Sequence, residues 1–409
     1  MIKKIPVSSL QPGMYLHELV ADWMSHPFLR NRFLIHDQHT IDKIVASGIR
    51  EAYIDSTRGL DVPDAPTQAE VSEQIEAEMS AALKDEMPKV QVTLADEMVR
   101  ARKIQIQASK VVHSVMQDAR LGRALNMAEV EPLVEDITAS IGRNQSALLS
   151  LVRLKSHDNY TFLHSVAVCA LMVTFCKALK LDEALTRQAG IGALLHDTGK
   201  MRVPDAILNK PGRFTDAEFD VMKRHPRDGY DILRSSGNEV SDVALDIALH
   251  HHERMDGTGY PDRLPGDQIS TVARMAAIVD VYDAITSDRC YHTGIPPAEA
   301  LKKMWEWSKY DFDQTLMRAF ISTIGIYPVG TLVRLESGRL GVVVELHLTE
   351  ILKPSVRVFF STRSNVHIPP QLIDLSRPHG PGGSDKIVSH EDPAKWGVDP
   401  LLYLTGATG

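Results

Sequence analysis

The chain has 409 residues, of which 44% are hydrophobic and 24% are charged, and its formal net charge is −8. This length exceeds one typical domain, so we expect two or three folded units of ordinary globular composition. The acidic balance argues against a nucleic-acid binder, because such proteins are more often basic. The longest apolar run is too short to cross a bilayer, and the N-terminus lacks the apolar segment of a signal peptide. The sequence has three cysteines, too few for a disulfide framework, so we expect a cytoplasmic protein.

The first 60 residues predict a small α+β domain, which we interpret as regulatory because it carries no visible chemistry. Short strand-like runs surround one helix, from Ile41 to Ser47, which Gly48 is expected to end. Residues 61–135 read as a linker followed by a helical connector, in which apolar residues recur at helical spacing. We interpret this stripe as core packing. A pairing stripe that would make a homodimer stays open, because sequence alone does not separate the two.

Residues 136–328 are expected to form a mainly α-helical domain. Helical patterns run from Phe162 to Leu179, Glu183 to Leu195, Val240 to Leu249 and Thr271 to Ile285. Gly199 is expected to stop the second of these helices.

After residue 328 the hydrophobic period changes to two, so residues 329–409 predict a β-rich extension. A hairpin and a third strand are expected there. From Arg377 onward proline, glycine and charge dominate, which predicts a loosely ordered tail.

Histidines concentrate in the helical region, where 8 of the 17 fall between positions 157 and 292. Candidate metal ligands are His164, His196, Asp197, His225, His251, His252 and Asp280. This nitrogen and oxygen set suits iron, manganese or zinc, and seven groups suffice for two ions that share Asp197. Two such ions could bridge a hydroxide and clamp an in-line displacement at phosphorus. Lys200, one turn beyond Asp197, could hold a phosphate oxygen or protonate the departing alkoxide.

Each candidate has a plainer explanation when it is taken alone. His164 could be a core histidine of an apolar helix, and His196 could be a cationic helix cap. His225 could simply begin a helix. At most two histidines of the triplet His250–His252 can face one site from a helix end. Asp280, however, lies among apolar neighbours, where a carboxylate is costly unless it is paired or metal-bound, so the joint pattern favours a metal centre.

Four segments closely resemble the HD-GYP domain family. They are His196-Asp197-Thr198-Gly199-Lys200, Lys223-Arg224-His225-Pro226, the stretch from His251 to Pro261, and Asp280-Val281-Tyr282-Asp283-Ala284. The match covers about residues 140–330, and the N-terminal region looks like the uncharacterised domain often found ahead of bacterial HD-GYP units. The resemblance implies a helical HD-superfamily fold, with a small N-terminal α+β domain and a short C-terminal β extension. It also implies hydrolysis of cyclic di-GMP to pGpG, sometimes on to GMP.

The resemblance also implies roles for individual residues. The seven candidates match the family's metal ligands, with Asp197 as the bridge and His250 as the spectator of the triplet. The ions are commonly iron or manganese, with zinc, nickel or magnesium as alternatives. Lys200 and Arg289 match positions that contact substrate phosphates, which makes Asp197 and Lys200 the expected catalytic residues. Tyr260 lies in the Gly259-Tyr260-Pro261 loop, which is expected near the substrate and which the family also uses for protein partners.

Two positions depart from the family pattern. Members with three metals carry a glutamate four residues before the first histidine, where this chain has Tyr160, so we predict two divalent ions. The family often has a basic residue three positions after Arg289, where this chain has His292. The charge of a histidine changes near neutral pH, so a substrate contact by His292 would depend on pH.

We therefore expect a bacterial signalling enzyme that binds cyclic di-GMP, with no nucleic-acid partner and no transmembrane segment. One alternative is a phosphodiesterase for another cyclic dinucleotide, such as cGAMP, or for a nucleotide monoester. Another is a non-catalytic sensor or adaptor that binds through the Gly259-Tyr260-Pro261 surface. The complete ligand set argues against this last class, because a domain without catalysis has no need of so many buried polar groups.

Overall fold

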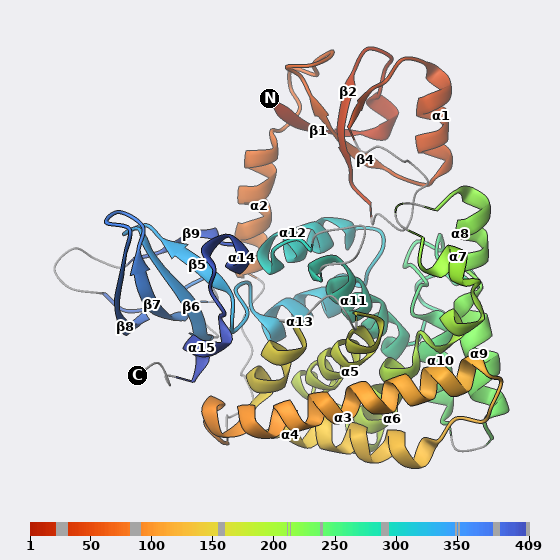
Figure 1. The fold of residues 1–409 in the computed structure, drawn as a ribbon. Helices are drawn as coiled ribbons and strands as arrows, with labels where there is room; N and C mark the ends of the chain where they lie inside the picture. The colour runs from red at the N-terminus through yellow and green to blue at the C-terminus, as the bar shows by residue number, and fades with distance from the viewer. Residues whose placement is uncertain are drawn as a thin grey trace.

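The structure is a computed structural model that describes residues 1–21, 32–81, 91–153, 160–210, 212, 214–237, 240–287, 294–347, 350, 352–378 and 385–405, with the backbone only at 80, 81, 160 and 161. The described chain is mainly helical, with a small sheet near each end (Figure 1). The expected fold class is confirmed.

The N-terminal sheet has four strands in the order β1-β4-β2-β3, all paired antiparallel. The strands are β1 (Ile2–Pro6), β2 (Tyr15–Leu19), β3 (Phe33–Leu34) and β4 (Glu51–Asp55), with a short 3-10 helix at Val7–Ser9. Helix α1 (Gln38–Ala46) packs on this sheet through apolar residues such as Ile41 and Ile44. The Asp37 side chain caps α1 by accepting from the Thr40 amide at 2.8 Å. Gly48 follows the helix with φ +77°, a conformation that favours glycine.

The connector consists of helices α2 (Gln68–Ala81), α3 (Leu94–Arg120) and α4 (Met127–Arg153). Helices α3 and α4 lie side by side along one edge of the molecule (Figure 1). The apolar stripe of α3 is buried within the chain, as core packing requires. The buried Glu97 carboxylate ties the two helices together, because it accepts from Arg143 Nε and Nη2 at 2.7 Å and from Ser140 at 2.8 Å.

The helical domain contains α5 (Tyr160–Ala178), α6 (Glu183–Leu195), the 3-10 helix Thr198–Arg202, α7 (Asp205–Leu208), α8 (Asp216–Met222), α9 (His225–Ser235), α10 (Asp242–His250), α11 (Thr271–Thr286), α12 (Pro297–Trp307) and α13 (Gln314–Ile324). Helix α5 is almost wholly buried and packs against α3, α4, α6, α11 and α13, and Figure 1 shows it near the middle of the helical part. The expectation for Gly199 was wrong: α6 ends at Leu195, and Gly199 lies inside the following 3-10 helix. Its backbone packs so closely on His225 and Gly229 that there is no room for a Cβ atom.

The C-terminal sheet has five antiparallel strands in the order β8-β7-β6-β5-β9. They are β5 (Leu332–Leu335), β6 (Arg339–Glu345), β7 (Ser355–Ser361), β8 (Val366–Asp374) and β9 (Ile387–His390), followed by α14 (Pro393–Trp396) and α15 (Leu401–Leu404). The expectation of a loosely ordered tail was wrong for residues 385–405. Strand β9 pairs with β5, and the Tyr403 ring stacks on Phe359 with 3.9 Å between ring centroids. These contacts bury apolar side chains that are scattered among polar residues, so the sequence pattern did not predict an ordered segment.

The N-terminal sheet docks on α12 through buried charged groups. Tyr53 Oη donates to Glu306 Oε1 at 2.7 Å, and Lys4 Nζ lies 2.7 Å from the same oxygen and 2.8 Å from Glu51. The side chains of Lys4 and Glu306 are each only 8% exposed. Because a buried charge is costly without its partner, this contact fixes how the two parts meet.

Within the described residues, no helix combines the length and the apolar character that crossing a membrane requires.

Candidate metal centre

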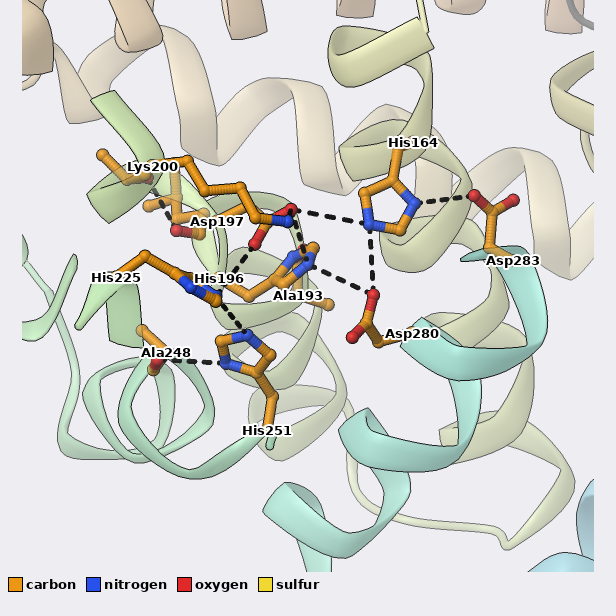
Figure 2. Close-up of polar contacts among 12 residues, drawn as sticks. His164, Ala193, His196, Asp197, Lys200, His225, Ala248, His251, Asp280 and Asp283 are labelled. Atoms are coloured by element: carbon orange, nitrogen blue, oxygen red, sulfur yellow. Dashed lines mark hydrogen bonds and ion pairs between the residues drawn. The ribbon is translucent and has the colours of Figure 1, made fainter. Parts of the chain in front are cut away.

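The structure brings all seven candidate ligands into one buried cluster, and none of them is more than 6% exposed. Figure 2 shows six of them converging between helices. His164 comes from α5 and Asp280 from α11, while His196 and Asp197 directly follow α6. His225 is the first residue of α9, and His251 and His252 directly follow α10. Every candidate ligand therefore lies on a helix or directly after one, where packing can fix its position.

The Asp197 carboxylate faces histidines from two sides. Its Oδ2 atom lies 3.4 Å from His196 Nε2 and 3.6 Å from His164 Nε2. Its Oδ1 atom lies 3.4 Å from His225 Nε2. Lys200 Nζ also donates to Oδ2, at 2.6 Å. This arrangement, in which each oxygen faces a different set of nitrogens, is what a carboxylate shared by two cations needs.

The Asp280 carboxylate closes the other side of the cluster. Its Oδ1 atom lies 3.1 Å from His164 Nε2 and 3.6 Å from His196 Nε2 (Figure 2). Its Oδ2 atom lies 3.8 Å from His252 Nδ1. Asp197 and Asp280 thus face the same pair of imidazoles from two different helix segments.

Hydrogen bonds on the outer side of the cluster orient four imidazole rings. The Nδ1 atoms of three histidines donate to backbone carbonyls: His196 to Ala193 at 2.8 Å, His225 to Met222 at 2.7 Å and His251 to Ala248 at 3.0 Å. Nδ1 of His164 donates to Asp283 Oδ2 at 2.7 Å. Because a carbonyl only accepts, the proton is assigned to Nδ1 and the Nε2 lone pair points inward, as in metal-ligating histidines.

Sequence reasoning missed Asp283 as the residue that orients His164. The available signal was its position three residues after Asp280 on α11, which places both carboxylates near one face of the helix.

The pKa values show that the cluster favours a positive charge between its carboxylates. Burial lowers the pKa of His196, but Asp197 and Asp280 outweigh burial and raise it to about 10. Burial, with a contribution from Lys200, lowers the pKa of His225 to about 4. Burial also keeps the pKa values of His251 and His252 well below their usual range. His225, His251 and His252 are therefore neutral at neutral pH, as metal binding requires, whereas His196 holds a proton between the carboxylates that a bound metal ion would replace.

The residues present fit a divalent metal. Ligand atoms lie within 4.8 Å of one another in each of three sets: His225, His251 and His252; His164, His196 and Asp197; and His196, His251 and Asp280. Among the described residues, His196 Nε2, Asp197 Oδ1 and His252 Nε2 are buried without a hydrogen-bond partner. Such atoms are costly unless a ligand satisfies them. Imidazole and carboxylate donors together suit iron, manganese or zinc.

The Gly259-Tyr260-Pro261 loop covers one side of the cluster. The Tyr260 ring lies against His252, with 4.7 Å between ring centroids, and the Tyr260 amide donates to the His252 carbonyl at 3.2 Å. A Cβ atom at Gly259 would lie 2.6 Å from the His252 oxygen, which explains the glycine there. Tyr260 therefore lies beside the candidate ligand His252, and the loop is near the cluster, as the family resemblance implied.

Glu253 anchors this loop, and sequence reasoning did not single it out. Its carboxylate is 1% exposed and accepts from the backbone amides of Asp262, Arg263 and Leu264 at 2.7, 3.0 and 3.1 Å. Its only sequence signal was an acidic residue directly after the histidine triplet.

His250 takes no part in the cluster. Its Nδ1 lies 2.6 Å from Asp246 Oδ1 and its Nε2 lies 3.2 Å from Asp262 Oδ2, so it ties α10 to the loop. Burial lowers the pKa of His250, but the two carboxylates outweigh burial and raise it above the usual value. The expected substrate contacts Arg289 and His292, and the side chain of Tyr160, lie outside the described residues.

Comparison with known proteins identifies the family. A model described as "Domain of unknown function (DUF3391)" matches residues 2–130, and one described as "HD domain" matches residues 130–316. The chain is 48% identical over 401 residues to Cyclic di-GMP phosphodiesterase PA4108 of Pseudomonas aeruginosa, a match that covers 97% of this chain and 94% of that protein. The chain belongs to the HD-GYP family.

Other relatives match shorter stretches of the chain. Over 197 residues the chain is 38% identical to Cyclic di-GMP phosphodiesterase response regulator RpfG of Xanthomonas campestris pv. campestris, covering 47% of this chain and 51% of that protein. Over 97 residues it is 46% identical to 3'3'-cGAMP-specific phosphodiesterase 2 of Vibrio cholerae, covering 24% of this chain and 19% of that protein. Relatives of this HD-GYP protein thus carry names with two different cyclic dinucleotides.

Proposed function

We propose that this protein is a metal-dependent phosphodiesterase that hydrolyses cyclic di-GMP to pGpG. The observation that carries the proposal is the buried cluster of five histidines and two aspartates, in which outer hydrogen bonds orient the rings of His164, His196, His225 and His251. The similarity to Cyclic di-GMP phosphodiesterase PA4108 over nearly the whole chain supports the choice of substrate.

The seven clustered residues would hold two divalent ions, iron or manganese, with Asp197 shared between them. Such ions supply Lewis acidity toward a phosphoryl oxygen and lower the pKa of water toward neutrality. Tyr160 supports two ions rather than three, because it stands where three-metal members carry a glutamate and a tyrosine is a poor replacement.

Residues around the centre would position the substrate and move its protons. Hydrolysis adds a water oxygen to phosphorus and breaks the bond to the 3' oxygen, which leaves with a proton. Lys200 Nζ, whose side chain is 17% exposed, is placed to hold a non-bridging phosphate oxygen or to supply that proton. The Tyr260 ring packs beside the His252 ring, while Asp283 keeps the His164 ring in its orientation. Arg289 and His292 remain proposed substrate contacts.

A second candidate is the hydrolysis of another cyclic dinucleotide such as cGAMP, which the 46% identity to a cGAMP-specific enzyme favours. The cellular setting is likewise a proposal: we place the activity in the cytoplasm. We also propose that protein partners dock on the Gly259-Tyr260-Pro261 surface. A homodimer remains a further proposal.

The test is an anaerobic preparation of the full chain, analysed for metals and assayed with cyclic di-GMP and 3'3'-cGAMP. We expect two ions per chain, and pGpG from cyclic di-GMP at a rate that Asp197→Ala reduces to background while also losing metal. Metal-loaded protein that binds cyclic di-GMP without product above the Asp197→Ala control would favour the sensor class instead. Faster turnover of cGAMP would favour the second candidate.

A further inference from the structure

A cleft of about 580 Å³ lies against the metal centre, and two domains line it. His252 and Tyr260 line it from the helical domain, while Ser47, Gly48, Ile49 and Arg50 line it from the turn between α1 and β4. The two sides touch, because a Cβ atom at Gly48 would meet Thr258 Cγ2 at 3.6 Å. The volume falls within the roughly 300–1,000 Å³ of small-molecule sites. A ligand bound at the centre would therefore share this cleft with the N-terminal domain.

Arg50 places a cation on the N-terminal side of the cleft. Its guanidinium lies over the Tyr310 ring, with 4.4 Å to the centroid. Its Nη2 atom lies 3.6 Å from Asp256 Oδ2, beyond hydrogen-bond distance, and its side chain is 52% exposed. The other oxygen of Asp256 accepts from the Thr258 hydroxyl at 2.6 Å and organises the loop. Arg50 is thus held by stacking and a loose ion pair, while its N–H donors remain accessible.

Different groups would contact the phosphodiester and the nucleobase of a cyclic dinucleotide in this cleft. In the proposed function, the metal centre and Lys200 would contact the phosphodiester that is cleaved. A nucleobase then has to occupy the part of the cleft farther from the ligands. An arginine that stacks on an aromatic ring presents a flat pair of donors, which matches the O6 and N7 acceptors of guanine. Adenine offers an amino donor at the corresponding position, which an arginine cannot accept.

We propose that the N-terminal domain completes the substrate site and that Arg50 recognises a guanine base of cyclic di-GMP. This inference rests on the proposed function, and it assigns to the domain of unknown function a direct part in substrate selection.

The experiment measures competition by cyclic di-GMP and by cyclic di-AMP against hydrolysis of bis(p-nitrophenyl) phosphate, a diester without a nucleobase. The variants are Arg50→Ala and Arg50→Lys in the full chain. The matched control is Arg58→Ala, because Arg58 is an exposed arginine of the same domain that also lies over a tyrosine, Tyr15 at 3.8 Å, but does not line the cleft. Metal content and melting temperature are measured for every variant.

For Arg50→Ala we expect the inhibition constant of cyclic di-GMP to rise about tenfold, equivalent to about 1.4 kcal/mol, with little change for cyclic di-AMP. Arg50→Lys should recover only part of the difference, because an ammonium lacks the paired donors. Arg58→Ala should keep the wild-type preference.

Three results would overturn the inference. An equal rise for both dinucleotides would mean that Arg50 contacts a phosphate. A parallel loss of metal or of bis(p-nitrophenyl) phosphate turnover would mean that Arg50 only supports the loop. Unchanged constants would remove it from the site. A wild-type enzyme that binds cyclic di-GMP without hydrolysing it would instead refute the proposed function, and the comparison of inhibition constants would still test Arg50.

Discussion

Because Gly199 packs closely on the start of α9, we expect Gly199→Ala, which adds one methyl group, to lower both stability and metal content. Gly199 lies in the 3-10 helix that carries Lys200, and His225 is a candidate ligand on the opposite element. A Cβ atom on Gly199 would lie 2.9 Å from the His225 carbonyl carbon and closer still to its oxygen and to the Gly229 nitrogen. Real Cβ contacts essentially never fall below 3.0 Å, and backbone atoms cannot rotate away. Gly199→Ala must therefore push the two segments apart.

The expected cost follows from that geometry. Overpacking costs typically about 1 to 3 kcal/mol, and we expect about 3 kcal/mol because only backbone movement relieves the clash. For a domain of this size, that corresponds to a melting temperature lower by about 6 to 12 °C. Moving α9 also moves His225 away from Asp197, from which it is 3.4 Å distant. Metal content and phosphodiesterase activity should fall together.

Differential scanning calorimetry and elemental analysis would check this expectation. The matched control is Gly142→Ala on α4, where a Cβ atom would meet only the flexible end of Lys177, at 3.4 Å. Alanine is the better helix former by about 1 kcal/mol, so the control should keep its metal and melt no lower than wild type. A Gly199→Ala variant that melts within about 2 °C of wild type and retains its metal would refute the predicted clash.

Three further substitutions test the outer parts of the site. Asp283→Asn should weaken metal binding about 10- to 100-fold in a chelator competition, because the His164 ring loses its charged partner; unchanged affinity would remove Asp283 from the site. Lys200→Ala should lower kcat about a hundredfold while metal analysis stays near wild type, and loss of metal would contradict its assignment to substrate. Glu306→Ala should destabilise the docked N-terminal sheet by about 3 kcal/mol in urea unfolding, because Lys4 and Tyr53 lose a buried partner. Burial lowers the pKa of Lys4, but Glu306 and Glu51 outweigh burial and raise it above 10.5. The stability that Lys4 contributes is therefore fully present below pH 10.5 and is lost as the pH rises through the raised pKa. A free energy of unfolding that does not change at alkaline pH would contradict the pairing.

The apolar pattern was enough to predict α5, α6, α10 and α11, but not α9, which begins at His225. The helix expected from Glu183 to Leu195 has those bounds, and the one expected from Thr271 to Ile285 extends by one residue. Both are rich in apolar residues, and α11 is buried along almost its whole length, so local composition and burial agree. Gly199 was misread because a glycine after a helix can serve either as a helix stop or as a close backbone contact. Only the position of His225, on another element, decides between the two.

The roles of Asp283 and Glu253 could not be predicted, because they depend on where each side chain points and not on its residue type. Asp280 and Asp283 are both acidic residues on α11, and the sequence does not say that one faces the cluster while the other binds the far side of His164. Glu253 looks like a surface residue until three backbone amides are seen to point at it. The tail was misjudged because the apolar contacts of Tyr403 and its neighbours are scattered among polar residues.

An acidic protein can bind an anionic substrate if the charged groups close to the site are favourable. The chain is acidic overall, yet its proposed substrate is an anion, so the global field opposes binding. At physiological ionic strength exposed charges are largely screened beyond about 8 Å, which means that only nearby groups decide how the substrate is received. The cleft gathers cationic side chains from both domains: Arg50, Lys223, Arg224, Arg227, Arg254 and Arg263. Several carboxylates share the lining, and Arg227 is paired with Asp262, so the cleft is mixed rather than uniformly positive. A mixed lining would attract the dinucleotide weakly at long range and leave selection to directed contacts, which is the condition under which a single arginine at the domain boundary can set base preference.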